Sequence, residues 1–393
     1  MGWYDRLTEQ LDGGARWPPV GLTGIAGTGN LPAKGHSQES ETMVSRQLAF
    51  VLAGAASLAL VGPAAAAPST EPKALRKHTF QVNPGPLPAK EKAAWSHAPY
   101  EAGDCSICHV SADPRKPGPL ATSGNALCYS CHDEFQEIMR RTYQHPPAVE
   151  SCLNCHNAHN ARERGLLHTE LATGCKDCHR QVKEIAEKSK VKHGALEQGA
   201  KCANCHNPHG TSVEKLLIQL PYDQCVNCHA VDDMKDHQGV VLTNYKKWLE
   251  ENQVWHAPVQ AKDCSACHRP HGGENFRLLV AGYPPSFYSP FDRKNYALCF
   301  GCHNEKVVSE PETRTLTNFR DGARNLHFLH VNKADRGRTC RACHEVHASK
   351  QPRHVRDGVP YGPKSWVLKI NFTKTPTGGQ CARTCHETKS YER

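Results

Sequence analysis

The stretch GDCSICHVSADPRKPGPLATSGNALCYSCHDEF, residues 103–135, contains two copies of Cys-x-x-Cys-His and almost no residues that could form a core. Closely spaced cysteines serve three chemistries: disulfide frameworks, tetrahedral zinc sites, and covalent attachment of c-type haem. In the last, both thiols bond the porphyrin and the following histidine binds its iron. Only haem attachment requires that histidine, so the rest of the chain decides among the three.

The same motif recurs as CLNCH, CKDCH, CANCH, CVNCH, CSACH, CFGCH and CRACH, and a tenth copy, CARTCH, has one extra residue. Neither zinc sites nor disulfides explain a histidine after every cysteine pair. The sequence therefore predicts ten covalently attached haem c groups. The attachment residues are all 20 cysteines of the chain: Cys105, Cys108, Cys128, Cys131, Cys152, Cys155, Cys175, Cys178, Cys202, Cys205, Cys225, Cys228, Cys264, Cys267, Cys299, Cys302, Cys340, Cys343, Cys381 and Cys385. The predicted iron ligands of the motifs are His109, His132, His156, His179, His206, His229, His268, His303, His344 and His386.

The motifs form five pairs, which is the sign of an internal repeat. The first cysteines of the two motifs are 23 residues apart in pairs one to three, 35 apart in pair four and 41 apart in pair five. A further histidine precedes each pair, and another follows the first motif of pairs two to five. The preceding histidines are His97, His145, His193, His256 and His330, and the trailing ones are His159, His209, His271 and His347.

Each haem iron needs a second axial ligand, and histidine is the residue type that the chain can supply. After the N-terminal segment only Met139 and Met234 remain as methionines, too few for ten irons. The preceding and trailing histidines give nine distal ligands, and His78 is expected to complete the set because pair one lacks a trailing histidine. Four histidines are left over, at positions 168, 237, 327 and 354, and are typical of surface or propionate-contacting residues; His327 could replace His330.

The trailing histidines also constrain the spacing of the irons. His206 and His209 are three residues apart, so their Cα atoms lie within about 11 Å of each other. So short a segment cannot wrap round a porphyrin, and we expect His209 to bind a different iron from His206. Repeated along the chain, this tether predicts closely spaced haems that exchange electrons by tunnelling.

The N-terminal residues predict export. Met43 begins MVSRQLAFVLAGAASLALVGPAAAAPS, with Arg46, an apolar run and a small-residue end, which is typical of a secretory signal peptide. The expected organisation is a non-native N-terminal extension (1–42), the signal peptide (43–67), a lead-in (68–96), pairs one to three (97–240), and pairs four and five with longer inserts (241–393). The mature chain is expected to be periplasmic or extracellular, without a membrane span.

The mature chain offers about 33 residues for each haem, too few for an ordinary core around each cofactor. We expect the porphyrins to supply most of the buried apolar surface. Helical spacing predicts short helices after Cys131, after Cys178 and from Leu242. The predicted fold is a multihaem cytochrome: loop-rich, with few short helices and little or no sheet, in an elongated haem-chain array. The long inserts cover haem faces or form a docking surface.

The net charge does not indicate nucleic-acid binding. Residues 68–393 contain 44 Lys and Arg against 34 Asp and Glu. Two propionates on each haem, offset by one positive charge on each ferric porphyrin, bring the oxidised protein close to neutral.

The unit formed by His-Ala-Pro, Cys-x-x-Cys-His-x-Pro-His and a second Cys-x-x-Cys-His resembles the repeat of multihaem cytochromes of the cytochrome c3 type. The count of ten is similar to that of the periplasmic decahaem conduits of metal-respiring bacteria. The resemblance covers His97 to His386 and implies low-potential bis-histidine haems. It also implies redox-protein or quinol-linked donors at the inner membrane and outer-membrane or extracellular acceptors. Pair one, the HGA of pair three and CARTCH depart from the pattern.

Three functions are compatible with these motifs. An electron relay in anaerobic respiration needs every iron capped by two protein ligands, which the histidines permit. A haem-bearing subunit of an extracellular filament would use the same groups. A multihaem reductase needs an open iron, and related enzymes show a lysine in place of a motif histidine, a variant that this chain lacks. We therefore expect an electron-transfer protein without catalytic residues.

Overall fold

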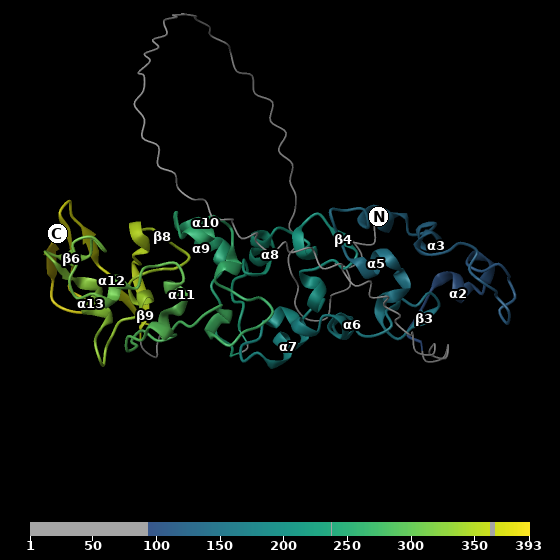
Figure 1. Ribbon diagram of the computed structural model, residues 1–393, viewed down its shortest axis with the longest axis horizontal. Coiled ribbons are helices and arrows are strands. Elements are labelled where there is room, and N and C mark those ends of the chain that lie inside the picture. The colour runs from purple at the N-terminus through teal and green to yellow at the C-terminus, as the bar shows by residue number, and fades with distance from the viewer. Residues whose placement is uncertain (1–92, 237, 362–365) are drawn as a thin grey trace, which may run out of the picture. The chain divides into compact units, whose positions relative to one another are not determined.

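The computed structural model describes residues 93–236, 238–361 and 366–393, which belong to one compact unit spanning residues 76–393. Short helices and strands alternate with loops throughout this part of the chain (Figure 1). The helices are α2 (Ala98–Ala102), α3 (Asn125–Tyr129), α4 (Asp133–Ile138), α5 (Pro146–Glu150), α6 (Leu171–Cys178), α7 (Arg180–Lys188), α8 (Pro221–Cys228), α9 (Tyr245–Glu251), α10 (Ala257–Gln260), α11 (Ala297–Phe300), α12 (Lys306–Ser309) and α13 (Leu326–Val331). The loop-rich fold with few short helices is confirmed, and α4, α7 and α9 lie where helical spacing predicts them.

The strands are short and pair in small antiparallel groups. They are β1 (Trp95–Ser96), β2 (Tyr143–Gln144), β3 (Asn160–Ala161), β4 (Gly210–Thr211), β5 (Val254–Trp255), β6 (Arg320–Asp321), β7 (Arg324–Asn325), β8 (Ala348–Ser349), β9 (Gly358–Tyr361), β10 (Trp366–Lys369), β11 (Phe372–Lys374), β12 (Gly378–Cys381) and β13 (Lys389–Glu392). The largest group is the three-stranded sheet β11-β12-β13, and β9 and β10 form a hairpin. The sequence pattern predicts little or no sheet, so it does not predict these C-terminal strands.

Each repeat unit contains one motif pair and the segment that leads into it, so the five units span residues 93–142, 143–190, 191–253, 254–310 and 311–393. Two-residue ladders link most neighbouring units: strand β1 of unit one pairs with β3 of unit two, β2 of unit two with β4 of unit three, and β5 of unit four with β8 of unit five. Units three and four meet at the single bridge between Val191 and Gly273. These short strands are therefore joints between units and do not form a common sheet.

The helices α2, α5 and α10 share one starting sequence. Each has a preceding histidine at its N-cap and a proline in its first turn. Proline suits this position because its fixed φ matches the helix and its missing N–H would have no partner there. The His-Ala-Pro pattern thus places a histidine ring at the start of a short helix.

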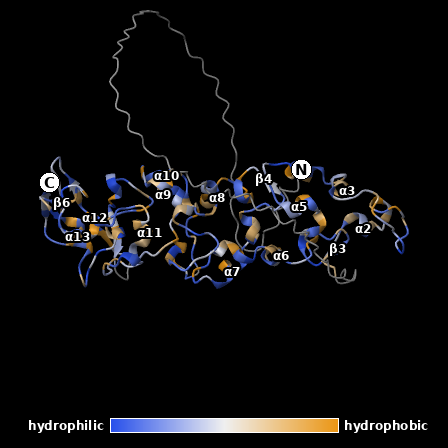
Figure 2. Cartoon of the chain, in the orientation of Figure 1, coloured by the Kyte–Doolittle hydropathy of each residue, from blue (hydrophilic) through white to orange (hydrophobic). Residues whose placement is uncertain are grey.

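The protein's own apolar core is small. Apolar and polar residues are interspersed along the described chain (Figure 2), and several buried apolar residues are alanines. The largest buried side chain, Tyr296, lies in the insert of unit four, where it packs against Tyr283 and Phe291 with ring centroids 5.9 and 5.8 Å apart. The aromatic cluster around Tyr296 lies within one insert and does not pack against every attachment motif.

Among the residues that the structure describes, no helix has both the length and the apolar character needed to cross a bilayer.

An ion pair strengthens the joint between units two and three. Glu170 caps α6 by accepting a hydrogen bond from the backbone N–H of Thr173, and its other oxygen lies 2.8 Å from Lys201 Nζ. The hydrogen bond from Lys201, helped by backbone donors, lowers the pKa of Glu170 to about 2.

We expect Glu170→Gln to lower the free energy of unfolding at pH 7 by about 1 kcal/mol or less, because the pair is partly exposed. The folded pKa lies below the unfolded value of about 4.3, so this stabilisation is present above that pH and is lost as the pH falls towards 2. In guanidinium unfolding, the difference in free energy of unfolding between Glu170→Gln and the native protein should be smaller at pH 3 than at pH 7. Glu137→Gln on α4 is the matched control, and an equal difference at both pH values would contradict the assignment.

Candidate haem-binding sites

The first motif of each unit is held by a local hydrogen-bond pattern. In unit three the backbone N–H of His206 donates to the carbonyl of Cys202, which folds the motif into a tight turn. The Nδ1 atom of the motif histidine then bonds a carbonyl nine residues on. The five Nδ1···O distances are 2.8 Å for His109 to Gly118, 2.7 Å for His156 to Gly165, 2.8 Å for His206 to Lys215, 2.9 Å for His268 to Arg277 and 2.9 Å for His344 to Arg353. A bond at Nδ1 fixes the ring and leaves Nε2 for a metal.

The residues that accept these bonds have a left-handed backbone. Lys215, Arg277 and Arg353 have φ values of 61°, 55° and 59°, although none is glycine. A non-glycine residue adopts this conformation only where its surroundings impose it. The sequence analysis missed these residues, because nothing in Lys or Arg signals a positive φ.

The preceding histidines are fixed across the joints between units. His97 Nδ1 lies 2.9 Å from the carbonyl of Ala158, and His193 Nδ1 lies 2.9 Å from the carbonyl of Pro270. In both cases the accepting residue directly precedes the trailing histidine of the next unit. The joint therefore orients both kinds of non-motif histidine.

Every motif histidine faces one other histidine of the same chain. The ring centroids are 6.0–6.3 Å apart and nearly parallel in nine pairs, and 6.5 Å apart with a 43° tilt in the tenth. The pairs, motif residue first, are His109 with His159, His132 with His97, His156 with His209, His179 with His145, His206 with His271, His229 with His193, His268 with His347, His303 with His256, His344 with His327, and His386 with His330.

The spacing within these pairs fits two axial ligands of one iron. An imidazole nitrogen bonds a metal at about 2 Å and lies about 1 Å from its own ring centre, so two imidazoles on opposite faces of a metal have centroids about 6 Å apart. Together with the two thiols beside each motif histidine, the donor set matches haem c with bis-histidine ligation.

Most pairs follow one rule. The preceding histidine of a unit faces the second motif of that same unit, whereas the trailing histidine faces the first motif of the previous unit. His209 of unit three thus faces His156 of unit two and not His206, as the short tether predicts. Unit one is the first motif pair in this sequence, and it has no trailing histidine.

The last unit departs from this rule, because His327 faces His344 of its own unit. His327 and His330 both lie on α13 and face different motif histidines, so they are not alternatives. His78, which the sequence predicts as a distal ligand, lies outside the described residues and stays a prediction. His168 instead has its Nε2 bonded to the carbonyl of Leu153, and His354 stacks edge-on to His256.

The thiols of consecutive attachment motifs lie next to each other. Between units, hydrogen bonds join Cys128 with Cys152, Cys175 with Cys202, Cys225 with Cys264, and Cys299 with Cys340. Within units, the thiols of the two motifs are within electrostatic reach of each other: Cys108 of Cys128, Cys155 of Cys178, Cys205 of Cys228, Cys267 of Cys299, and Cys343 of Cys385. The attachment sites therefore follow one another in space in the order of the sequence.

Burial keeps the imidazoles of His209 and His327 neutral at pH 7. It lowers the pKa of His209 to about 4 and the pKa of His327 to about 4, with further contributions from the facing histidines. The neutral imidazole is the form that binds a metal. In residues 93–236, 238–361 and 366–393, no three His, Cys, Asp or Glu side chains converge on a candidate site for a bare metal ion.

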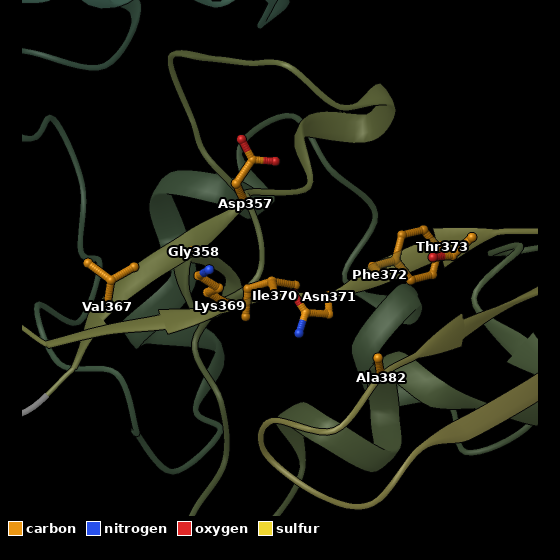
Figure 3. Close-up of a pocket in the computed structure, with 9 residues that line it drawn as sticks. All are labelled: Asp357, Gly358, Val367, Lys369, Ile370, Asn371, Phe372, Thr373 and Ala382. Atoms are coloured by element: carbon orange, nitrogen blue, oxygen red, sulfur yellow. The ribbon is translucent and has the colours of Figure 1, made fainter.

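A hollow of about 550 Å³ adjoins the last motif. It is lined by residues of the β9–β10 hairpin, by Ile370 and Asn371 after it, by Phe372 and Thr373 of β11, and by Ala382 (Figure 3). Ala382 directly follows Cys381, so this hollow borders the attachment site of CARTCH.

Comparison with known families places these motifs. The model of the doubled CXXCH motif matches residues 97–137, 145–184, 193–234 and 256–308. Each matched segment begins at a preceding histidine. In units one, two and four, the strand that forms a joint lies directly ahead of that histidine. No curated protein matches the chain. From its doubled CXXCH motifs and the paired histidines around them, the chain is a multihaem c-type cytochrome with covalently bound haem.

Proposed function

We propose that this protein is a decahaem cytochrome that relays electrons along one continuous series of ten bis-histidine haem sites. The observation that carries the proposal is the set of ten facing histidine pairs, each beside its own pair of thiols. When bound, each haem supplies an iron that accepts and returns one electron. The protein's part is to attach, orient and space these groups.

The residues divide these tasks among themselves. The cysteines of each motif would hold the porphyrin covalently, and the motif histidine and its partner would bind the iron. Carbonyls such as that of Lys215 fix the ring orientation by accepting a hydrogen bond from Nδ1. This bond also makes the imidazole a stronger metal ligand through Nε2. The ladders and the bridge between units set the order of the sites along the described chain.

We further propose that the relay works outside the cytoplasm, in the periplasm or at the cell surface, during respiration. The signal-peptide pattern at Met43 and the use of every cysteine in haem attachment support this location. Redox proteins are the expected partners, with quinol-linked donors on one side and outer-membrane or extracellular acceptors on the other.

The pairing favours a relay over the two alternatives. A reductase needs one iron with an open position, whereas each motif histidine of this chain faces a second histidine. A filament whose subunits complete one another's haem sites needs a ligand from the next copy, whereas here all ten partners come from the same chain. Neither alternative gains support from the geometry.

The proposal predicts ten haem additions in the intact mass of the denatured protein, and an entirely low-spin oxidised spectrum. Midpoint potentials should lie well below those of methionine-ligated cytochromes c, because methionine raises the potential. The titration should be broad, because neighbouring sites interact. Nine haems would show that CARTCH is not used, and a native high-spin iron would favour the reductase.

A further inference from the structure

The inserts of units four and five meet in an aromatic cluster. Phe287 of the first insert packs edge-on against Tyr361 of the second, with ring centroids 5.0 Å apart, and Tyr288 lies 6.1 Å from the same ring. Trp366, across the β9–β10 hairpin, has its ring 6.5 Å from that of Tyr361. Two segments more than 70 residues apart in the sequence thus form one surface feature.

A glycine allows this approach. The backbone N–H of Ser289 donates to the carbonyl of Gly337 at 2.8 Å, and a Cβ at position 337 would lie 2.7 Å from the carbonyl oxygen of Ser289. The loop at 332–338 is therefore fixed against the first insert, and its side chains have a defined place beside the aromatic cluster.

The outer part of this cluster is exposed. The exposed fraction is 61% for Trp366, 52% for Val367 and 37% for Tyr361, whereas Val359 and Leu368 of the same hairpin are buried. Strand alternation places all of these side chains except Val367 on one face of the hairpin, so that face is buried at one end and open at the end that carries Trp366. Such apolar side chains gathered at one place are typical of interaction sites.

Basic side chains lie on the loop beside the aromatic cluster. The Arg338 guanidinium lies 5.9 Å from the ring centre of Tyr288, and Lys333 and Arg336 are exposed on the same loop. We name Tyr288, Arg338, Tyr361 and Trp366, with these loop charges, the basic aromatic surface.

The positive charge of the described chain is concentrated in the last unit. Residues 311–393 contain 16 Lys and Arg against 7 Asp and Glu, whereas residues 93–310 contain 23 against 25. Two oxidised haems would lower the charge of the last unit only to about +7, and eight would bring the preceding units to about −10. The propionates therefore sharpen the contrast between the ends.

The basic aromatic surface adjoins the last attachment sites. Tyr288 is within electrostatic reach of the Cys385 thiol, and Arg338 is within reach of Cys343. A molecule seated on this surface would be next to the ninth and tenth haem sites.

We propose that the basic aromatic surface docks the acidic face of a redox protein, which exchanges electrons with the C-terminal end of the haem series. The proposal rests on the relay function. Trp, Tyr and Arg are the residues that dominate protein–protein hot spots, and exposed Lys and Arg side chains beside them steer acidic partners to the site. This composition favours a protein over a lipid surface.

The test uses an acidic flavodoxin as the probe and the oxidised cytochrome with all its haems. Calorimetric titration should give a dissociation constant that rises with salt, because the steering charges are exposed. Lys333→Glu/Arg336→Glu should raise the dissociation constant at least about tenfold, and Trp366→Ala should raise it at least about fivefold. Arg180→Glu/Lys183→Glu on α7, with the same change in net charge, is the matched control and should bind as the native protein does.

Three outcomes would overturn the proposal: an equal loss in both charge-reversed variants, unchanged flavodoxin binding combined with loss of binding to phosphatidylglycerol vesicles, or loss only of self-association in sedimentation. Dithionite titration of the same variants separates this proposal from the relay function. A variant that still takes up all its electrons but fails to bind flavodoxin supports the docking surface. A native protein that takes up all its electrons and shows no flavodoxin binding overturns the docking surface alone.

Discussion

His209→Ala is expected to produce one high-spin haem, and that haem should be the one attached at Cys152 and Cys155. His209 belongs to unit three, but its ring lies 6.0 Å from that of His156 in unit two. The mutant should keep ten haems by mass, because attachment depends on the thiols. A change of about 60 mV at this third site would alter its electron occupancy about tenfold and slow passage along the series.

Magnetic spectroscopy of the oxidised protein would count the high-spin irons, and proteolysis followed by spectroscopy of the haem peptides would locate the altered site. His168→Ala is the matched control, because His168 lies in the same region but has its Nε2 bonded to the Leu153 carbonyl. It should stay entirely low-spin. A low-spin His209→Ala protein, or a high-spin iron at the Cys202 site, would contradict the pairing.

Removing an internal attachment site should cut the relay into two parts. We expect Cys264→Ser/Cys267→Ser to lack the seventh haem, because both anchoring thiols are lost. With the protein bound to an electrode through its carboxyl terminus, voltammetry should show fast exchange for three haems only. The other six should respond more slowly by orders of magnitude, since they lie beyond the gap.

Cys105→Ser/Cys108→Ser removes one haem from the far end and provides the control. Because that site has no further neighbour, the remaining nine haems should all exchange quickly with the electrode. Fast exchange of nine haems in the internal variant as well would mean that the sites do not form a single ordered series.

The chemistry of the sites can be predicted from the sequence far better than their geometry. Ten histidines after ten cysteine pairs identify the cofactor, and the three-residue spacing of His206 and His209 shows that a trailing histidine serves another haem. Which haem it serves depends on joints such as the Val191–Gly273 bridge, which bring together residues about 80 positions apart. No local pattern encodes such a contact.

The last unit was the hardest to predict. His327 and His330 are three residues apart in LHFLH, and this spacing alone suggests that only one of them is a ligand. In α13 the two rings leave the helix towards different motif histidines, His344 and His386. The β9–β10 hairpin and the β11–β13 sheet were missed because their strands are short and lack sustained alternation of apolar residues.

The rule that a trailing histidine completes the previous unit has a consequence for biogenesis. On the proposed export route the chain emerges amino terminus first, and the second haem of each unit finds its partner at once. The first haem must wait with an open coordination position until the next unit emerges. A chain that stalls after unit two, three or four would carry one such reactive iron, whichever unit it had reached. Unit five brings His327 as the partner of its own first haem, so its arrival completes the ten pairs.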